Sequence, residues 1–407
     1  MSLKDWLRPP RHLLVAFFSI TLALSAGLGW LGWLLLEQDR VLEVQRFQER
    51  QEVAADLVTA ALQARLSELE GGLTRLATGT RGGLTIEAAE SSRGLPEDAA
   101  FVVLDAAGVE AWPKRRLLYY PWLPPAQEPA ADLFAAADAL EFRKQDYAGA
   151  IAALGSPTRA ADPATRAAAL VRLARNYRKI GRWQEALTAY EDLRRLCTTP
   201  VGELPAELLA RDALGALLEN RKDARLQSQA AALYADLGSG RWRLSRAAYA
   251  FYASQAGRRA GVLEGQGERQ AAVALAEAVE ALWEEWQRVQ RGEGMAAGRR
   301  CQRFNDRPVL LVWRTSSDRM AAMAAGTGFV ESRWMRALEP TLSSHAARVA
   351  LVDSDGRSVW GSLEHGPGRP AVRVASLTQL PWTIQAFSRG GTTLLGDLAV
   401  RRRLLVA

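Results

Sequence analysis

The first pattern along the chain is an apolar run near its N-terminus. Residues 13–36 contain no charged side chain, and a helix of about 20 such residues spans the hydrocarbon core of a bilayer. Trp30 and Trp33 lie toward the end of the run, where aromatic rings favour the membrane interface. The run therefore predicts a transmembrane helix. A cleaved signal peptide is the alternative, although its apolar region is usually only about 7–15 residues long.

The charges on either side of this run are unequal. Three basic residues precede it, Lys4, Arg8 and Arg11. Two acidic residues, Glu37 and Asp39, follow it. Basic residues tend to stay on the cytoplasmic side of a membrane. We therefore expect residues 1–12 to be a cytoplasmic tail and the bulk of the chain to be extracytoplasmic, anchored in a bacterial inner (cell) membrane.

Residues 37–80 continue the helix as a membrane-proximal segment with an amphipathic pattern. Apart from a polar gap after Phe47, apolar side chains recur at steps of three and four residues, which is the period of a helix. They are Val41, Val44, Phe47, Val58, Leu62, Leu66 and Leu69. This face could pack on the chain's own domain, or it could form a dimer helix that carries motion to the bilayer. Glycine pairs at 71–72 and 82–83 are expected to interrupt the pattern.

A strand hairpin is predicted within residues 98–125. The apolar run 101–104 meets Asp105 and Gly108, and a second run ends at Trp112. Asp and Gly at these places indicate a turn between two strands. We interpret the segment as a sensor sub-domain. Prolines at its end mark the start of a linker.

Residues 130–297 are predicted to be helical, because Ala, Leu and Arg dominate the composition. Within them one stretch has small and large residues at the spacing of two packed helices. These residues are Leu170, Leu173, Tyr177, Gly181, Trp183, Ala186, Leu187 and Tyr190. The stretch resembles a tetratricopeptide repeat. The resemblance implies a stack of helical hairpins that binds peptides or packs on a neighbouring domain, and it does not imply catalysis.

An earlier and weaker copy of the repeat can be aligned before this one. Its matching positions are Phe134, Ala137, Tyr147, Ala150 and Leu154. The copy departs from the pattern at two places. Gln145 stands where the turn glycine is expected, and Glu141 stands where the tyrosine is expected. The helices that follow, up to residue 297, keep the helical period without a phase that can be assigned.

Residues 305–390 change to a mixed pattern of strands and one helix. Strands are predicted at 309–313, 349–352, 358–361, 370–377 and 382–387, with a helix at 329–347 and a turn at 353–356. This order, with Leu380-Pro381-Trp382-Thr383-Ile384 opening the last strand, resembles the second half of a PAS-like or Cache-like sensor domain.

One pattern occurs twice in the chain, at 103–112 and at 351–360. Each copy has an apolar pair, Asp, two residues, Gly, three residues and Trp. The copies are either two similar hairpins or parts of two related sensor units with the helical region between them. Residues 404–407 are apolar and follow three arginines at 401–403. We interpret residues 401–407 as the start of a truncated second transmembrane helix, with a basic tail as the alternative.

Composition adds little chemistry to this picture. The net charge of +7 is spread along the chain, and no basic motif predicts a nucleic-acid partner. Cys197 and Cys301 are predicted to be separate buried thiols, although an oxidising periplasm would allow them to pair. His345 is expected to cap a helix or lie on the surface. No spacing indicates a metal site, a cofactor site or a catalytic site.

The predicted fold class is mainly α with a smaller α+β part: one transmembrane helix, a tetratricopeptide-like region and a PAS/Cache-like domain. With membrane helices around a sensor domain, the layout resembles the sensory part of a two-component sensor histidine kinase, whose kinase core is absent from this sequence. A membrane-anchored tetratricopeptide scaffold is the alternative. Expected partners are the membrane, a second copy in a homodimer, and a small ligand or a periplasmic protein. Four residues nearest the expected ligand position are Arg333, Trp334, Arg348 and Arg373.

Overall fold

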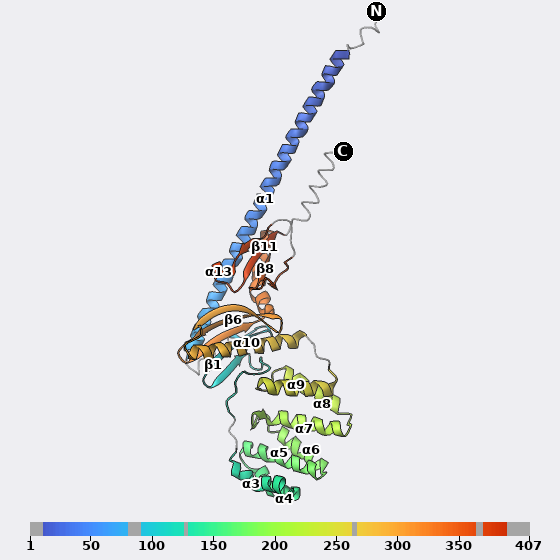
Figure 1. Ribbon diagram of the computed structural model, residues 1–407, viewed down its shortest axis with the longest axis vertical. Coiled ribbons are helices and arrows are strands. Elements are labelled where there is room, and N and C mark those ends of the chain that lie inside the picture. Colours follow the sequence, from blue (N-terminus) through green and yellow to red (C-terminus); the bar gives the residue numbers. More distant parts are fainter. Residues whose placement is uncertain (1–10, 80–90, 126–128, 263–266, 364–368, 389–407) are drawn as a thin grey trace, which may run out of the picture.

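The chain is mainly helical and carries two main antiparallel sheets. The computed structural model describes residues 11–79, 91–125, 129–262, 267–363 and 369–388. In Figure 1 a long helix, α1 (Arg11–Thr78), runs past both sheets, and a stack of helices lies at the end of the molecule farthest from the N-terminus. The N-terminal ten residues, the glycine pair at 82–83 and the segment 401–407 lie outside the described residues.

Helix α1 is uninterrupted from the apolar run into the folded part of the chain. The segment Val15–Leu34 is long and apolar enough to cross a membrane, and none of it is buried against the rest of the protein. The expected break at Gly71 and Gly72 does not occur, because the helix continues to Thr78. Each glycine costs a helix about 1 kcal/mol, but Leu73 and Leu76 in the same turns are buried, and this packing outweighs the cost.

The first sheet combines strands from both sides of the helical region. Its order is β2-β1-β7-β6-β5. The strands are β1 (Ala99–Asp105), β2 (Gly108–Trp112), β5 (Ala297–Phe304), β6 (Arg307–Thr315) and β7 (Arg319–Ala325). The β1–β2 hairpin is the one that the sequence predicts, and β1 also pairs with β7 along its whole length. The hairpin is therefore one edge of a larger sheet.

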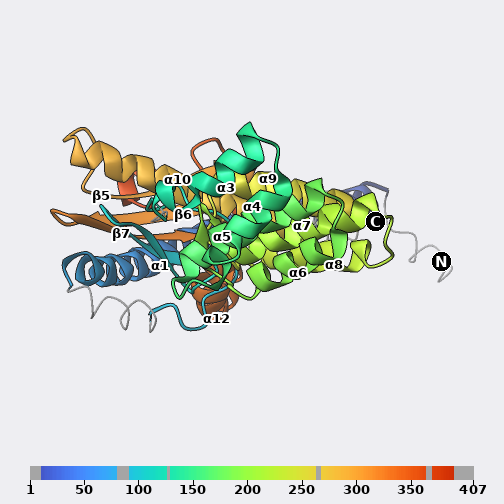
Figure 2. The ribbon, with the colours of Figure 1, turned by 90° about the horizontal axis from the view of Figure 1, so that it is seen from below.

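Helices cover both faces of this first sheet. In Figure 2 the strands lie between α1 on one side and α10 (Gly267–Gln290) on the other. The residues of α10 that face the sheet, among them Leu275, Leu282 and Trp286, share a core with Trp313 of β6. The expected helical region of 130–297 thus includes a helix that belongs to the sheet. The hydrophobic period of α10 indicates that one face of the helix is apolar. It does not indicate which element packs on that face.

The second sheet has the order β10-β11-β8-β9. Its strands are β8 (Ala347–Val352), β9 (Ser358–Trp360), β10 (Ala371–Arg373) and β11 (Thr383–Ser388). Three helical segments lead to it from the first sheet: α11 (Thr327–Phe329), η4 (Val330–Met335) and α12 (Arg336–Ser344). A short helix, α13 (Ala375–Thr378), precedes β11. The strands within the expected unit of 305–390 are therefore divided between the two sheets.

The two sheets share one arrangement of strands. In each, the first strand lies between its hairpin partner and the last strand of the sheet, as β1 lies between β2 and β7 and β8 between β9 and β11. The repeated sequence pattern falls on the two hairpins. Their registers differ, because Trp112 opposes Phe101 whereas a bulge in the second hairpin sets Trp360 opposite Leu351.

The helical stack lies between β2 and α10 in the sequence. Its elements are η1 (Ala131–Phe134), α3 (Ala135–Asp138), η2 (Ala139–Arg143), α4 (Tyr147–Leu154), η3 (Pro157–Arg159), α5 (Pro163–Lys179), α6 (Trp183–Arg194), α7 (Ala206–Asn220), α8 (Leu226–Gly238) and α9 (Arg246–Ala260), with a two-residue hairpin of β3 (Pro200–Val201) and β4 (Leu204–Pro205). Ala186 is fully buried in the α5–α6 hairpin. Gly181 and Gln145, the two turn residues of the aligned copies, both have positive φ.

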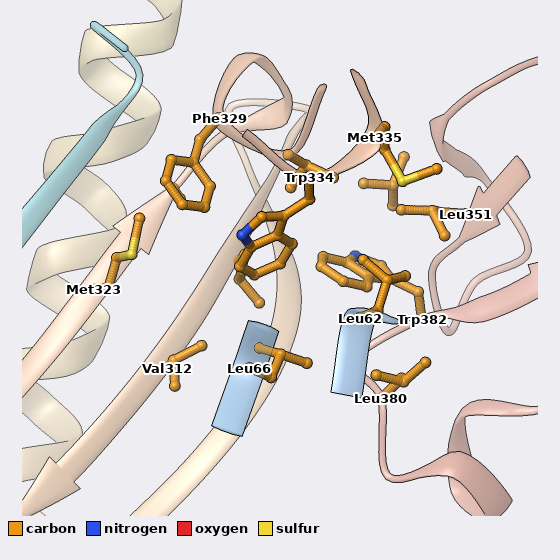
Figure 3. Packing of buried hydrophobic residues seen from close by; sticks show 14 of the residues in the cluster. Leu62, Leu66, Val312, Met323, Phe329, Trp334, Met335, Leu351, Leu380 and Trp382 are labelled. Carbon is orange, nitrogen blue, oxygen red and sulfur yellow. The ribbon is translucent and has the colours of Figure 1, made fainter. Parts of the chain in front are cut away.

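A single apolar core joins α1 to both sheets. Leu62 and Leu66 of α1 lie in one cluster with residues of the first sheet and of the second sheet. In Figure 3 these two leucines lie below Trp334 and Trp382, with Val312 and Met323 on one side and Leu351 and Leu380 on the other. The two sheets are therefore packed as one body around the lower part of α1.

Candidate functional site

A pocket of about 290 Å³ lies beside the second sheet, between η4–α12 and the β8–β9 hairpin. Its wall is apolar, with Met335, Leu342, Val349 and Trp360. Its rim is charged, with Glu331, Arg336, Glu339 and Arg348. Small-ligand pockets usually have about 300–1,000 Å³ and a few polar groups on an apolar wall. At about 290 Å³ this pocket is just below that range.

Local structure explains how these side chains come together. Glu331, Met335 and Glu339 recur every four residues, so they lie on one face of the helical segment. Arg348 is exposed on β8, where buried neighbours alternate with it at the start of the strand. His345 ends α12, and its Nδ1 lies 2.9 Å from the Thr341 carbonyl oxygen. The histidine is thus a helix cap, as the sequence predicts.

The rim of the pocket carries both signs of charge. All four of its charged residues are exposed. The side chains of Arg336 and Arg348 form no hydrogen bond or ion pair with another residue in the described part of the chain. Both guanidinium groups are therefore available to a ligand carboxylate, which they bind well because of their planar geometry. The two glutamates can meet an ammonium group, so the arrangement suits a small zwitterion.

Of the four residues expected near a ligand, only Arg348 lines this pocket. Trp334 is buried in the core shared by the two sheets. Arg333 donates to the Gly94 carbonyl oxygen, and Arg373 contacts α1. Proximity in the sequence to the expected helix and hairpin does not decide which side chains reach the pocket. The four-residue spacing around Met335 is the signal that points to Glu331 and Glu339.

Arg373 connects the second sheet to α1. Its Nε lies 2.6 Å from Asp56 Oδ1 and its Nη1 lies 2.7 Å from Glu52 Oε2. The hydrogen bond from Arg373 holds the pKa of Asp56 below its usual value. Two turns further on, Gln63 Nε2 donates to the Thr378 carbonyl oxygen at 2.8 Å. These contacts fix the second sheet along the membrane-proximal part of the helix.

Glu70 connects the first sheet to the same helix. Its carboxylate lies 3.1 Å from Arg299 Nε on β5 and 2.6 Å from Arg314 Nη2 on β6. Glu70 is buried, so its charge is compensated by these two arginines rather than by water. Arg319 adds a hydrogen bond to the Gly79 carbonyl oxygen at 2.7 Å. Each sheet thus has its own polar attachment to α1.

Arg303 connects the two sheets directly. Its Nε donates to Asp353 Oδ2 at 2.7 Å, and its Nη2 donates to the Ser358 carbonyl oxygen at 3.1 Å. Asp353 also accepts from the backbone amides of Asp355 and Arg357, which shapes the β8–β9 turn. Burial acts to raise the pKa of Asp353, but these hydrogen bonds outweigh it and the pKa is lowered. The hairpin that borders the pocket is therefore held by the first sheet.

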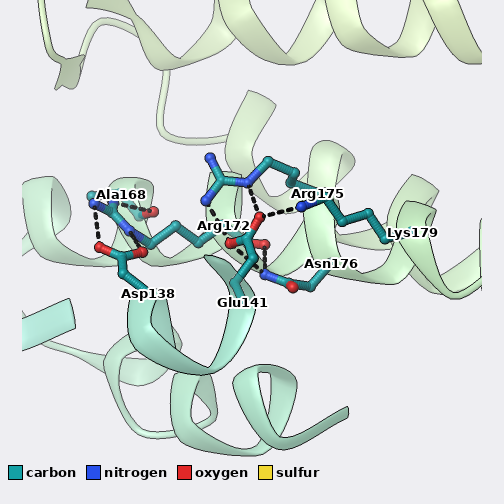
Figure 4. Close-up of polar contacts among 7 residues, drawn as sticks. All are labelled: Asp138, Glu141, Ala168, Arg172, Arg175, Asn176 and Lys179. Atoms are coloured by element: carbon teal, nitrogen blue, oxygen red, sulfur yellow. Dashed lines mark hydrogen bonds and ion pairs between the residues drawn. The ribbon is translucent and has the colours of Figure 1, made fainter. Parts of the chain in front are cut away.

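A second polar cluster lies in the helical stack. Figure 4 shows Glu141 of η2 facing Arg175, Asn176 and Lys179 of α5. Arg175 Nη2 lies 2.6 Å and Lys179 Nζ lies 3.0 Å from its carboxylate oxygens. Burial acts to raise the pKa of Glu141, but these donors outweigh it and lower the pKa to about 2. Glu141 is one of the two residues that depart from the repeat pattern, and it joins the two aligned copies.

The cysteines and acidic groups give no sign of redox or metal chemistry in the part of the chain that the structure describes. Cys197 and Cys301 are both free, and Cys197 is exposed rather than buried as expected. Burial raises the pKa of Cys301 to about 11, so its thiol stays protonated. The described residues contain no cluster of ligands suited to a metal ion.

Comparisons of the chain with protein-family models, with curated proteins and with solved structures find no match.

Proposed function

We propose that this chain is the extracytoplasmic signal-sensing portion of a membrane-bound receptor of the two-component sensor histidine kinase type. One observation carries the proposal. The apolar span Val15–Leu34 and the residues that pack between the two sheets belong to the same continuous helix. A movement of either sheet would therefore be transmitted to the membrane span along one continuous helix.

The pocket beside the second sheet is the proposed signal-binding site. A ligand there would contact α12 and the β8–β9 hairpin at once. It can shift the balance between two arrangements only if it binds one of them better. Closing the pocket would move α12 toward β8, and both elements share the core with Leu62 and Leu66 of α1. This is the route by which binding energy would reach the membrane helix.

The receptor is proposed to act as a homodimer in the bacterial inner membrane. The core uses Val58, Leu62 and Leu66, so this part of the periodic face packs on the chain's own sheets. The side chains of Val41, Val44 and Phe47 lie outside the described residues. A second, exposed stripe remains on α1. Val53, Leu57, Ala60 and Ala64 are exposed and follow each other at steps of four, three and four residues. This is the spacing of a two-stranded coiled coil.

The sensing proposal predicts that a small zwitterion stabilises the chain. The purified chain in detergent would be screened by thermal unfolding against amino acids, organic acids and sugars. A ligand at 100 times its dissociation constant should stabilise by about 2.7 kcal/mol. Replacing both rim arginines, Arg336→Gln and Arg348→Gln, should abolish the shift. Arg195→Gln is the matched control, because this exposed arginine forms an ion pair with Asp192 on the helical stack, away from the pocket.

The alternative function is a membrane-anchored scaffold that binds proteins through the helical stack. It is supported by the helical hairpins from η1 to α9 and by the exposed apolar side chain of Phe142, which is 60% exposed. The same screen separates the two proposals. If every compound leaves the unfolding midpoint unchanged and a periplasmic protein binds the helical stack, the scaffold replaces the sensor.

A further inference from the structure

A larger pocket, of about 620 Å³, lies where the helical stack meets the first sheet. Residues of α8, α9 and α10 line it, together with Asn305 from the turn between β5 and β6. The same turn leads back to Arg303, which binds the second sheet. The pocket shares no lining residue with the one beside α12, so the two are separate. It lies between the helical stack and the first sheet.

Two guanidinium groups line this pocket without an acidic partner. Neither Arg258 nor Arg269 forms an ion pair with any carboxylate that the structure describes, and the lining contains no Asp or Glu. Other arginines nearby are neutralised. Arg246 pairs with Glu277 and Glu280, and Arg259 pairs with Asp212 and Glu219. The pocket therefore concentrates positive charge in a region where arginines are otherwise compensated.

Arg269 is held in a fixed position. Its guanidinium lies over the Tyr234 ring, 3.5 Å from the ring centroid, and its Nη2 donates to the Tyr234 carbonyl oxygen at 2.9 Å. Burial lowers the pKa of Arg269 from its ordinary value. An arginine nevertheless stays charged in proteins. A half-buried cation without an anion is unfavourable, so an anionic ligand would gain from meeting it.

The rest of the pocket offers a neutral donor and an apolar wall. Tyr249 is buried, and its hydroxyl group has no hydrogen-bond partner among the described residues. Burial raises the pKa of Tyr249 to about 12, so the hydroxyl keeps its proton and can donate it to an acceptor. Val262 and Val273 supply apolar surface. Tyr234 presents its ring beneath Arg269.

We propose that this pocket binds a small organic anion, a carboxylate with a compact aromatic or apolar body. Arg258 and Arg269 would bind the carboxylate, and Val262 and Val273 would contact the body. The occupant would touch α8 and α9 of the stack and α10 of the first sheet at once. Its presence would therefore fix the helical stack against the sheet that holds α1. This site is independent of the zwitterion pocket.

Benzoate and benzamide form a matched pair of probes, because they have the same shape and only benzoate is charged. Binding would be measured by titration calorimetry on the full chain in detergent. We expect benzoate to bind and benzamide to bind at least tenfold more weakly. Arg258→Gln should weaken benzoate binding at least tenfold, and Arg269→Gln should do the same. Arg258 is exposed, so its variant should keep the fold if Arg269→Gln does not.

Two control variants identify the site. Arg348→Gln removes a guanidinium from the zwitterion pocket, and Arg195→Gln removes one from the surface of the stack. Both should bind benzoate like the unaltered chain. The proposal is overturned if benzoate fails to bind at millimolar concentration, if benzamide binds as well as benzoate, or if Arg258→Gln has no effect. Loss of benzoate binding in Arg348→Gln would also overturn it, by moving the anion to the other pocket.

Discussion

Glu141 shows how one buried charge sets the packing of the helical stack. Its side chain is 1% exposed and meets a cation from each of two successive turns of α5. Removing one partner of a buried pair leaves the other charge uncompensated, which is more costly than losing a surface ion pair. In the repeat pattern a tyrosine would fill this position. At this position an ion pair between η2 and α5 stands where the repeat pattern would have an apolar contact.

Glu141→Gln is predicted to destabilise the stack by about 2 kcal/mol at neutral pH, because the hydrogen bonds lose their charge. The pKa of Glu141 is lowered to about 2 in the folded chain. Its stabilising effect is therefore complete above its unfolded pKa and is lost as the pH falls toward 2. The difference between variant and unaltered chain should shrink over that range in chemical unfolding. An equal difference in the free energy of unfolding at pH 7 and pH 3 would contradict this role of Glu141. The control is Glu191→Gln, because Glu191 forms an exposed ion pair with Arg194.

Single residues were predicted well where local geometry decides their role. Ala186, Gly181 and His345 lie as the sequence indicates, because helix contacts, tight turns and helix caps depend on near neighbours. Arg333 and Arg373 were expected near a ligand, yet each binds a segment about 240 or more residues away, at Gly94 and at Asp56. Such partners depend on the tertiary fold, which local spacing does not contain.

Among the elements, α1 has two different faces along its folded part. One face carries Val58, Leu62 and Leu66 into the core, while Val53 and Leu57 remain 47% and 41% exposed. The sequence predicted the helix and its period correctly. It did not separate the two faces, since both have apolar residues at steps of three and four. The strands predicted at 309–313, 349–352, 358–361 and 382–387 are present. The strand predicted at 370–377 is wrong in its second half, because only Ala371–Arg373 forms a strand and Ala375–Thr378 is the helix α13. The partners of β1 and α10 come from distant parts of the chain.

A single cysteine at Leu57→Cys, with Cys197→Ser and Cys301→Ser, tests both the homodimer and the orientation. In intact cells, oxidation should produce a disulfide-linked dimer, because position 57 lies on the exposed stripe. A membrane-impermeant thiol reagent should label the unoxidised protein. The control variant Arg65→Cys should cross-link less, because Arg65 is also exposed but lies outside the stripe. Labelling only after cell lysis would reverse the proposed orientation, and equal cross-linking at both positions would argue against the stripe.

At the scale of the whole molecule, two sheets, one long helix and a helical stack are joined by a few contacts. The core between the sheets and α1, the Arg303–Asp353 pair and the attachments of Glu70 and Arg373 make the sheets and α1 one body. The stack has its own apolar clusters. Composition and period predicted this order of parts along the chain. They did not predict that β1, which precedes the helical region, pairs with β7, which follows it.

Hydrogen exchange on the full chain in detergent tests whether α1 and both sheets respond as one unit. Leu66→Ala opens a cavity in the shared core and should cost about 2–5 kcal/mol. We predict faster amide exchange in β6 and β7 and, to a similar extent, in β8 and β11. Leu214→Ala, in the core of the helical stack, should speed exchange in α5, α6 and α7 only. If Leu66→Ala affected one sheet and left the other unchanged, the two sheets would not be coupled through α1 and the proposed route to the membrane would be wrong.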